Sequence, residues 1–461
     1  MAKIAALGSY LYQSVLAFGL LIAVSNLLTA PNYVAYSLFV SIVQFADIAC
    51  FQWLRSACSR FYPGPDEGGE RAQRGVIIAE FIASAALCLL GIVVAALFDV
   101  PLWLGLTGAI AAILQGGGEL HLTMLRFRHE FRLFSWLQGA RATIQAATTL
   151  AGAALGGDLN HVVAGILTGN LVYCILACVL SRHILPWSCA WDGKLAKRHL
   201  VYGGVSAGAS IAGILAPLGL KTIFVSGLGS AGAAGPLLAL DLLQRPFGMI
   251  LNSLQAVRYP ELVGRFDRES GSKDLQVELG RYYALLTGSA LLGAAGLIAL
   301  LGAVTATVVP LALRDSFAQT APLIMLMALL RALTHTLLST PAHLQRSLPA
   351  IVGLAGLDCV LTCAGAWMAA ALDPGAGTAI AAGTAGGAAA AAAFGALMLR
   401  QQPFVMPWWP VLASAAALSL AWLSVGLFAG DLLRATSVAL AVALVFGAAP
   451  SFTFLRWVAR S

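Results

Sequence analysis

A small set of ionisable side chains interrupts the long apolar stretches of this sequence. The acids are Asp47, Glu80, Glu119, Asp241 and Asp358, the bases are Arg141, Lys221, Arg245 and Arg331, and His121 and His335 can also titrate. A charge inside a lipid bilayer is costly, so such residues usually face a charged partner or a water-filled cavity and are functional candidates. The four bases would bind an anion. The candidates for coupling to an ion are Asp47, Glu119, Asp241, Asp358 and His335.

Two pairs of these groups have the four-residue spacing that places side chains on one face of a helix. Asp241 and Arg245 can form an ion pair there, and Pro246 would loosen the backbone one residue further on. This pair is either a structural salt bridge or one that opens when substrate or a proton enters. Arg331 and His335 repeat the spacing, which suits either an anion sensor or an ordinary interior histidine.

Polar residues gather on two predicted helices of the first half. Asp47 and Arg55 lie two turns apart on nearly the same face, which indicates either a water-filled cavity or a hydrogen bond between helices. Three glycines stand directly before Glu119 in the run Gln115-Gly-Gly-Gly118-Glu119. Because glycine weakens a helix, this run predicts either a bend or a close approach of neighbouring helices.

Arg141 is the strongest candidate among the bases of the first half, since Gln138 and Gln145 accompany it at helical spacings. Arginine pairs bidentately with the oxygens of carboxylates and phosphates, so a cationic cavity would suit an anionic cargo. A cavity for a cationic drug would be lined mainly by acids. Four interior Lys and Arg residues against five interior acids do not decide between the two.

The elements that must position these residues are helices that span a membrane. Of the 461 residues, 59% are hydrophobic and only 10% are charged, and the mean hydropathy is +0.85. Apolar runs of about 20 residues, the length needed to cross a bilayer, follow one another along the chain. Segments such as 75–97 lack the alternation of a β-barrel strand. We therefore expect an all-α, polytopic membrane protein.

Short polar segments separate the apolar runs and divide the chain into fourteen predicted transmembrane helices: 8–29, 33–58, 75–97, 101–126, 134–156, 160–181, 201–226, 232–257, 282–305, 319–340, 348–372, 376–398, 410–429 and 435–457. The first run has no convincing cleavage site after it, so we expect a helix and not a signal peptide. Most of the 27 Lys and Arg residues lie on the side of the N-terminus, and the opposite side holds only Arg314 and Arg434. The positive-inside rule then places both termini in the cytoplasm and explains the net charge of +7 without a nucleic-acid partner.

A weak internal repeat relates the two halves. One predicted helix ends in Arg60-Phe-Tyr-Pro63 and runs into a mixed-charge loop from Asp66; another ends in Arg258-Tyr-Pro260 and also runs into a mixed-charge loop. Each of these helices carries one interior acid. We expect two six-helix bundles in parallel pseudo-repeat, residues 1–199 and 200–398, and two additional transmembrane helices in residues 399–461.

The segment between the predicted bundles, 182–199, contains Trp187, Trp191 and several basic residues. Aromatic and basic side chains without a span-length apolar run suit an interfacial segment at the level of the lipid headgroups, and an ordinary loop is the alternative. Pro407-Trp408-Trp409 is a similar anchor before the thirteenth predicted helix.

These motifs together resemble those of the Wzx-type oligosaccharide flippases, within the multidrug/oligosaccharidyl-lipid/polysaccharide exporter superfamily. The first matching stretch, 27–63, contains a Thr-Ala-Pro-Asn-Tyr turn, Tyr36, Gln44, Asp47, Trp53-Leu-Arg55 and the terminal Arg-Phe-Tyr-Pro. The second contains Lys221-Thr-Ile-Phe, a glycine-rich turn from Gly227, Asp241-Leu-Leu-Gln-Arg-Pro246 and Arg258-Tyr-Pro. Members often carry an acid directly before the basic residue at the end of helix 7, where this chain has Leu220.

The resemblance implies two lobes around a central cavity, alternating access, and an oligosaccharide linked to undecaprenyl pyrophosphate as cargo. The cargo would be flipped outward across the bacterial inner (cytoplasmic) membrane for capsule, exopolysaccharide or lipopolysaccharide O-antigen assembly, with a polysaccharide polymerase and glycosyltransferases as partners. The alternatives are a peptidoglycan precursor or a cationic drug on the same scaffold, and, from another class, a membrane glycosyltransferase or polymerase.

An enzyme is disfavoured because the sequence has no paired-carboxylate or metal-ligand constellation. It also lacks a GxxxxGK[ST] motif, which disfavours direct ATP drive. We therefore expect no catalytic residue, no metal and no cofactor, and energy from an ion gradient or from consumption of the flipped product.

Overall fold

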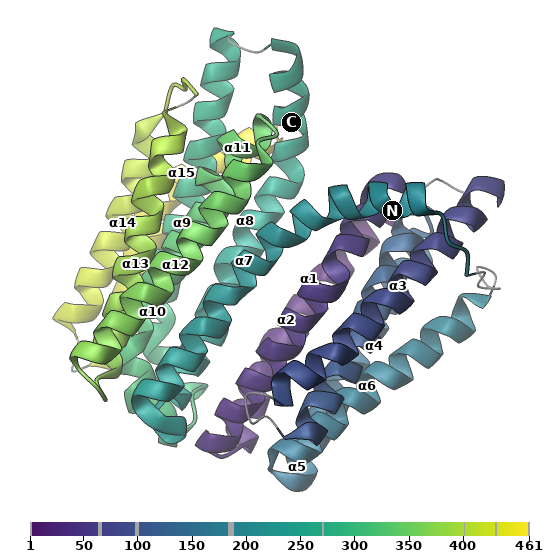
Figure 1. Cartoon of the computed structure of the whole chain (residues 1–461). Helices are drawn as coiled ribbons and strands as arrows, with labels where there is room; N and C mark the ends of the chain where they lie inside the picture. The colour runs from purple at the N-terminus through teal and green to yellow at the C-terminus, as the bar shows by residue number, and fades with distance from the viewer. Residues whose placement is uncertain are drawn as a thin grey trace. The chain divides into compact units, whose positions relative to one another are not determined.

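A computed structural model describes residues 2–62, 67–96, 101–182, 189–269, 272–400, 402–428 and 431–459, and the regular elements among them are all helical (Figure 1). They are α1 (Ala2–Leu27), α2 (Ala30–Phe61), α3 (Glu67–Ala96), α4 (Leu102–Phe127), α5 (Phe131–Gly156), α6 (Leu159–Leu180), α7 (Gly193–Gly232), α8 (Ala234–Glu269), α9 (Lys273–Thr307), η2 (Leu311–Leu313), α10 (Arg314–Leu333), η3 (Thr334–Leu338), α11 (Thr340–Leu344), α12 (Leu348–Leu372), α13 (Gly377–Leu399), α14 (Trp408–Leu427) and α15 (Leu432–Ala459). Each predicted span coincides with a helix, and the tenth is divided into α10, η3 and α11.

Ten helices in the described part of the chain are long and apolar enough to cross a membrane. The chain is therefore an all-helical, polytopic membrane protein, as the composition predicts. Helices α4, α5 and α8 fall outside that set because they carry the interior charges, glutamines and glycines that the sequence singles out.

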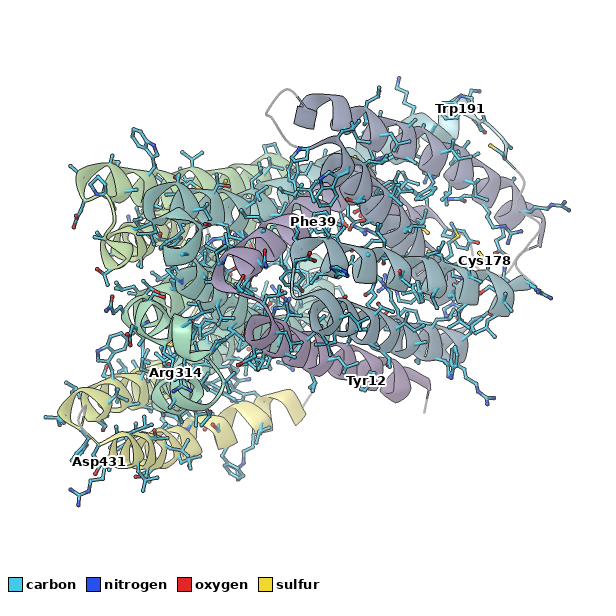
Figure 2. All side chains as sticks on the ribbon, turned by 90° about the horizontal axis from the view of Figure 1, so that it is seen from below. Tyr12, Phe39, Cys178, Trp191, Arg314 and Asp431 are labelled. Atoms are coloured by element: carbon cyan, nitrogen blue, oxygen red, sulfur yellow. The ribbon has the colours of Figure 1, made fainter. Side chains whose placement is uncertain are left out.

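Large apolar side chains remain exposed along the sides of the helices, as Figure 2 shows for the whole molecule. Leu155, Trp367, Leu372 and Leu433 are examples. A water-soluble protein rarely leaves so much apolar surface uncovered, whereas a bilayer solvates it. These side chains mark the faces of the helices that meet lipid.

The chain divides into two compact units, Met1–Leu218 (unit 1) and Gly219–Ser461 (unit 2). In unit 1, α5 packs along α1 and α6, while α4 packs against α2, α3 and α6. In unit 2, α10 packs against α8 and α13, α12 packs along α13, and α14 and α15 pack on each other and on α9. The predicted three-part division and the internal repeat remain predictions.

Four predicted helix ends are wrong, all in charged segments. Helix α8 continues beyond the predicted end at 257 to Glu269, and α3, α7 and α9 begin at Glu67, Gly193 and Lys273, each two turns or more before the predicted start. Hydropathy locates the membrane-spanning part of a helix but not a charged extension beyond it. Ion pairs at helical spacing, such as Arg74–Glu70 and Arg258–Glu261, support these extensions.

The predicted interfacial segment is partly helix, because residues from Gly193 onward form the first turns of α7. Trp191 is 68% exposed and lies at the periphery of the molecule in Figure 2, where an anchoring indole belongs. The predicted glycine-rich turn is found at Gly229, which has a φ of 71° and ends the regular helix of α7. Pro63, Asp66 and Trp187, which were part of the sequence predictions, lie outside the described residues.

Candidate functional site

Four interior charges of unit 1 form one connected chain across α2, α4 and α5. Arg55 Nη1 donates to Asp47 Oδ2 at 2.9 Å and also to Glu119 Oε2. Arg141 Nη2 donates to the other oxygen of Glu119, Oε1, at 3.0 Å. The sequence places Asp47 and Arg55 on one helix face, and the fold brings Glu119 and Arg141 to them.

The four side chains differ in their access to solvent. Those of Asp47 and Arg141 are only 3% and 6% exposed, and that of Arg55 is 10% exposed, whereas Glu119 is 34% exposed. Buried charges need partners, because removing one partner leaves the other charge unpaired in a low-dielectric medium. Glu119 is therefore the accessible member of the network and the one that an incoming charge would meet first.

Arg55, Glu119 and Arg141 line a cavity of about 220 Å³ within unit 1. The other lining residues are Gln13, Leu122, Thr123, Arg126, Phe134 and Gln138. Three arginines thus face a single carboxylate, with amide groups beside them. A water occupies roughly 30 Å³, so the cavity has room for several waters or for a group the size of a phosphate. Its lining suits an anion.

One donor on Arg141 has no partner within the described part of the chain. Arg141 Nε is buried and makes no hydrogen bond there, although the guanidinium lies 5.8 Å from the ring centroid of Tyr173. A buried, unpaired N–H is costly, so it would gain from an acceptor oxygen that a substrate brings. Arg141 is thus held in place by Glu119, while one of its hydrogen-bond donors, Nε, has no acceptor among the described residues.

The three glycines before Glu119 bring neighbouring helices close to the network. A Cβ on Gly116 would lie 2.6 Å from the Phe51 ring of α2, and one on Gly118 would lie 2.8 Å from the Tyr173 ring of α6. Helix α4 is continuous through this run. Of the two roles that the sequence left open, the structure therefore assigns close packing to the run.

Substituting Gly116 tests this packing. Gly116→Ala is expected to destabilise the protein by about 1–3 kcal/mol, because the added methyl overlaps buried Phe51 and crowds Asp47. Gly91→Ala is the matched control in α3, where nothing lies within 4 Å of the new Cβ and helix propensity alone should stabilise. Thermal unfolding of the two purified variants compares them. Equal unfolding temperatures would contradict the packing assignment.

A second network lies in unit 2, around Asp358 of α12. Arg331 Nε donates to Asp358 Oδ2 at 2.9 Å, and His335 Nε2 lies 2.9 Å from the same oxygen. The Asp358 side chain is fully buried, whereas His335 is 34% exposed. His335 belongs to η3, a π-helical turn, and such turns occur often at functional sites. The four-residue spacing of Arg331 and His335 thus allows both side chains to contact the same carboxylate, that of Asp358.

The charges of α7 and α8 pair differently from the sequence prediction. Lys221 Nζ donates to Asp241 Oδ1 at 2.6 Å, so the carboxylate is paired with Lys221 and not with Arg245. Arg245 donates its Nε to the backbone oxygen of Asp241 at 3.1 Å, and its side chain is exposed. Buried Leu220 stands before Lys221, and the acid beside this lysine comes from the next helix. The four-residue spacing correctly placed Asp241 and Arg245 on one face of α8, but it did not identify Lys221 as the partner of the Asp241 carboxylate.

The sequence alone does not identify Arg126 and His199 as site residues. Arg126 belongs by position to the basic residues of the predicted cytoplasmic side, although it lines the cavity. Arg55 is related to Asp47 by helical spacing but is not identified as a base of the cavity. His199 fell in the interfacial segment, yet its fully buried ring places Nδ1 3.0 Å from Glu80. No local signal reveals such a pair, because its members are 119 positions apart.

The fold resembles those of solved membrane transporters. A structure described as "Lipid II flippase MurJ, inward closed conformation" matches with a TM-score of 0.74 and 10% identity over 96% of this chain and 98% of the other. A "Crystal structure of MATE in the straight conformation" matches with a TM-score of 0.57 and 12% identity over 87% and 96%.

A third match is the outward-facing conformation of a multidrug resistance MATE family transporter of the MOP superfamily, with a TM-score of 0.52 and 11% identity over 86% and 93%. No family model and no curated protein matches the sequence. At these identities the likeness concerns the fold alone. The chain has the fold of the MurJ and MATE transporters of the MOP superfamily.

Proposed function

We propose that this protein flips a lipid-pyrophosphate-linked oligosaccharide from the cytoplasmic to the outer leaflet of the inner membrane for surface polysaccharide assembly. The observation that carries the proposal is the cavity of unit 1, where Arg55, Arg126 and Arg141 face one accessible acid, Glu119. Arginine is suited to the doubly charged, oxygen-rich pyrophosphate because its planar fork pairs with two oxygens at once.

In this proposal Glu119 acts as the resident anion of the cavity. At rest it satisfies Arg55 and Arg141, which are too buried to remain unpaired. A pyrophosphate entering the cavity would compete with Glu119 for both arginines, while Asp47 would keep Arg55 in place. The exchange lets the cavity bind an anion and release it again, since Glu119 pairs with both arginines in the resting state.

Arg331 and Lys221 of unit 2 remain candidate substrate residues, and Arg245 has the accessible side chain expected of one. Asp358 and Asp241 hold Arg331 and Lys221, as Glu119 holds the arginines of unit 1. The ion-coupling candidates all belong to these pairs. Asp47 and Glu119 pair with arginines of unit 1, Asp241 pairs with Lys221, and Asp358 accepts from Arg331 and lies beside His335. An alternating-access cycle that opens these pairs would couple cargo to ion binding.

A change at Glu119 separates an anionic from a cationic cargo. Glu119→Gln is expected to raise the affinity of the purified protein for inorganic pyrophosphate several-fold, because the competing carboxylate is gone. A cation exporter should instead lose affinity for its substrate. Titration calorimetry on wild type, Glu119→Gln and the exposed control Asp373→Asn, which lies outside both arginine-lined pockets, measures both. Weaker pyrophosphate binding in Glu119→Gln would argue against an arginine-centred anion site.

The second candidate cargo is lipid II, the substrate named for the similar MurJ structure. Deleting the protein in its host distinguishes the two. We expect loss of surface polymer with lipid-linked oligosaccharide accumulating on the cytoplasmic leaflet, while cell-wall synthesis continues. Normal surface polymer together with arrested cell-wall synthesis would replace the first cargo by the second.

A further inference from the structure

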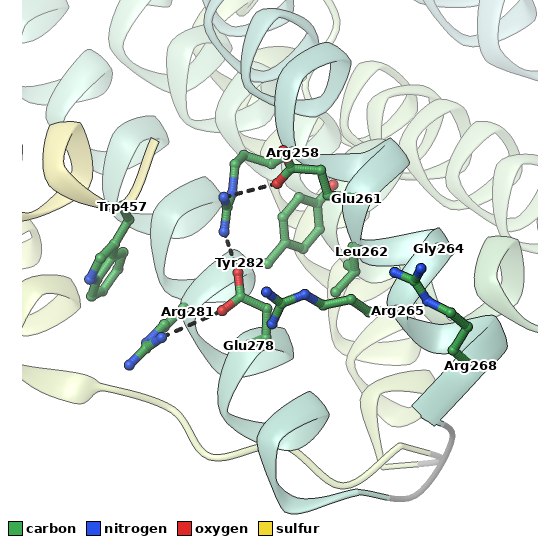
Figure 3. Close-up of a pocket in the computed structure, with 10 residues that line it drawn as sticks. All are labelled: Arg258, Glu261, Leu262, Gly264, Arg265, Arg268, Glu278, Arg281, Tyr282 and Trp457. Carbon is green, nitrogen blue, oxygen red and sulfur yellow. Dashed lines mark hydrogen bonds and ion pairs between the residues drawn. The ribbon is translucent and has the colours of Figure 1, made fainter. Parts of the chain in front are cut away.

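A second arginine-rich pocket lies in unit 2, where the ends of α8 and α15 meet the start of α9 (Figure 3). It has a volume of about 490 Å³, and we call it the α8–α9 pocket. Its charged and aromatic lining is Arg258, Glu261, Arg265, Arg268, Glu278, Arg281, Tyr282 and Trp457. Four arginines therefore face two glutamates.

Both glutamates are already engaged by two of the arginines. Arg258 donates to Glu261 at 3.1 Å and also to Glu278, and Arg281 lies 3.5 Å from the other oxygen of Glu278. These pairs build the wall of the pocket. Among the described side chains, Arg265 and Arg268 are the two lining arginines that form no ion pair with these glutamates.

Arg265 and Arg268 are exposed, and neither forms a hydrogen bond or ion pair with another described side chain. In Figure 3, Arg265 extends from α8 toward the space flanked by Glu278 and Arg281. Asp274 borders the adjoining hollow, where three arginines still face two acids. Two guanidinium groups one turn apart can thus close on an anion.

Unit 1 holds a similar cluster of arginines around one acid, Glu70, whose carboxylate has several donors. Glu70, in the first turn of α3, accepts from the Tyr62 hydroxyl at 2.7 Å, from Arg128, and lies 3.5 Å from Arg74. Burial raises the pKa of Tyr62, so this hydroxyl stays a donor. In the cluster around Glu70, both arginines pair with the acid. In the α8–α9 pocket, the described side chains pair only Arg258 and Arg281 with the glutamates.

The aromatic side chains on the elements around this pocket are typical of a membrane surface. Trp457 lines it, and exposed Trp408 and Trp409 begin α14, which packs along α9. The N–H of Val405, just before α14, donates to the Gln276 oxygen of α9 at 3.0 Å and ties the two elements together. Tryptophan gathers at the level of lipid headgroups. Basic pockets between transmembrane helices at that level bind phosphate-bearing headgroups.

We propose that the α8–α9 pocket binds a phosphate group through Arg265 and Arg268, at a site separate from the cargo cavity of unit 1. The phosphate belongs either to an anionic phospholipid headgroup or to a free phosphate or pyrophosphate in solution. The site does not depend on the identity of the cargo, since it lies on other helices and uses other residues.

Native mass spectrometry of the full-length purified protein tests the proposal. The probes are phosphatidylglycerol, zwitterionic phosphatidylcholine and inorganic pyrophosphate, each titrated without cargo. Pyrophosphate is titrated into proteins that also carry Arg141→Ala, so that the cavity of unit 1 does not contribute to its binding. The test variant is the double substitution Arg265→Gln/Arg268→Gln. The matched control, Arg60→Gln/Arg71→Gln, removes two exposed arginines from the ends of α2 and α3 of unit 1. Both variants lose the same net charge, and all four side chains are exposed, so folding should survive.

We expect phosphatidylglycerol or pyrophosphate to bind the wild type and the control alike, and to bind the test variant about tenfold more weakly. Binding of phosphatidylglycerol in preference to pyrophosphate assigns the phosphate to a lipid, and the reverse order assigns it to a soluble anion. Equal binding of phosphatidylglycerol and phosphatidylcholine with no pyrophosphate binding overturns the proposal. So does undiminished binding in the test variant.

Discussion

Arg141→Ala is expected to reduce surface polymer by at least about a hundredfold at a normal level of the protein in the membrane. The substitution removes a guanidinium that holds Glu119 at 3.0 Å and lines the cavity, and whose buried Nε has no hydrogen-bond partner in the described part of the chain. A bidentate, charge-assisted contact in a desolvated site contributes several kcal/mol, and each 1.4 kcal/mol corresponds to a factor of ten. The measurement is surface polymer in a deletion strain complemented with the variant.

The control for Arg141→Ala is Arg132→Ala on the same helix, because Arg132 is exposed and lies outside the cavity lining. It should leave export within about twofold of wild type. Arg141→Lys keeps the charge but loses the planar fork, so export should fall between the two. Full export by Arg141→Ala at a normal protein level would remove this residue from the substrate site.

Asp358→Ala is expected to destabilise the protein by about 3–5 kcal/mol, the cost of leaving a buried charge without its partner. Asp358 is the carboxylate shared by Arg331 and His335, and the Arg331 side chain is only 7% exposed. The expected result is a lower thermal unfolding temperature and less protein in the membrane. Purified protein in detergent and immunoblots of membranes measure the two effects.

Asp373→Ala provides the comparison at the end of the same helix, where the side chain is exposed. It should change the stability by no more than about 0.5 kcal/mol. The double variant Asp358→Ala/Arg331→Met should recover much of the loss, since it removes both charges together. If the single and double variants were equally unstable, the Arg331–Asp358 pair would not be the source of the loss.

The sequence predicts the helices well and their ends poorly. Apolar runs of membrane-spanning length identify every span, because lipid forces each backbone polar group to be satisfied within a helix. Beyond the bilayer that constraint ends, so the charged ends of α3, α7 and α8 remain helical for reasons that hydropathy does not measure. Ion pairs such as Arg258–Glu261 depend on spacing and contribute no apolar signal.

The sequence predicts most residues of the candidate site. It predicts much less well which acid pairs with which base. The cost of burying charge identifies Asp47, Glu119 and Arg141, and helical spacing relates Asp47 to Arg55. Which carboxylate meets which base depends on how helices pack, and this decided that Lys221 holds Asp241. The glycines before Glu119 marked the packing point correctly but could not name the helices that meet there.

We have proposed that the arginine cavity of unit 1 binds the pyrophosphate of a lipid-linked cargo during its transfer across the membrane. The most direct test is translocation of a fluorescent, prenyl-pyrophosphate-linked oligosaccharide in liposomes that contain wild-type protein, Arg141→Ala or Arg132→Ala. We predict that wild type and Arg132→Ala move the lipid to the opposite leaflet and that Arg141→Ala stays at the level of protein-free liposomes. Translocation by Arg141→Ala at the wild-type rate, or none by the folded wild-type protein, would contradict the account.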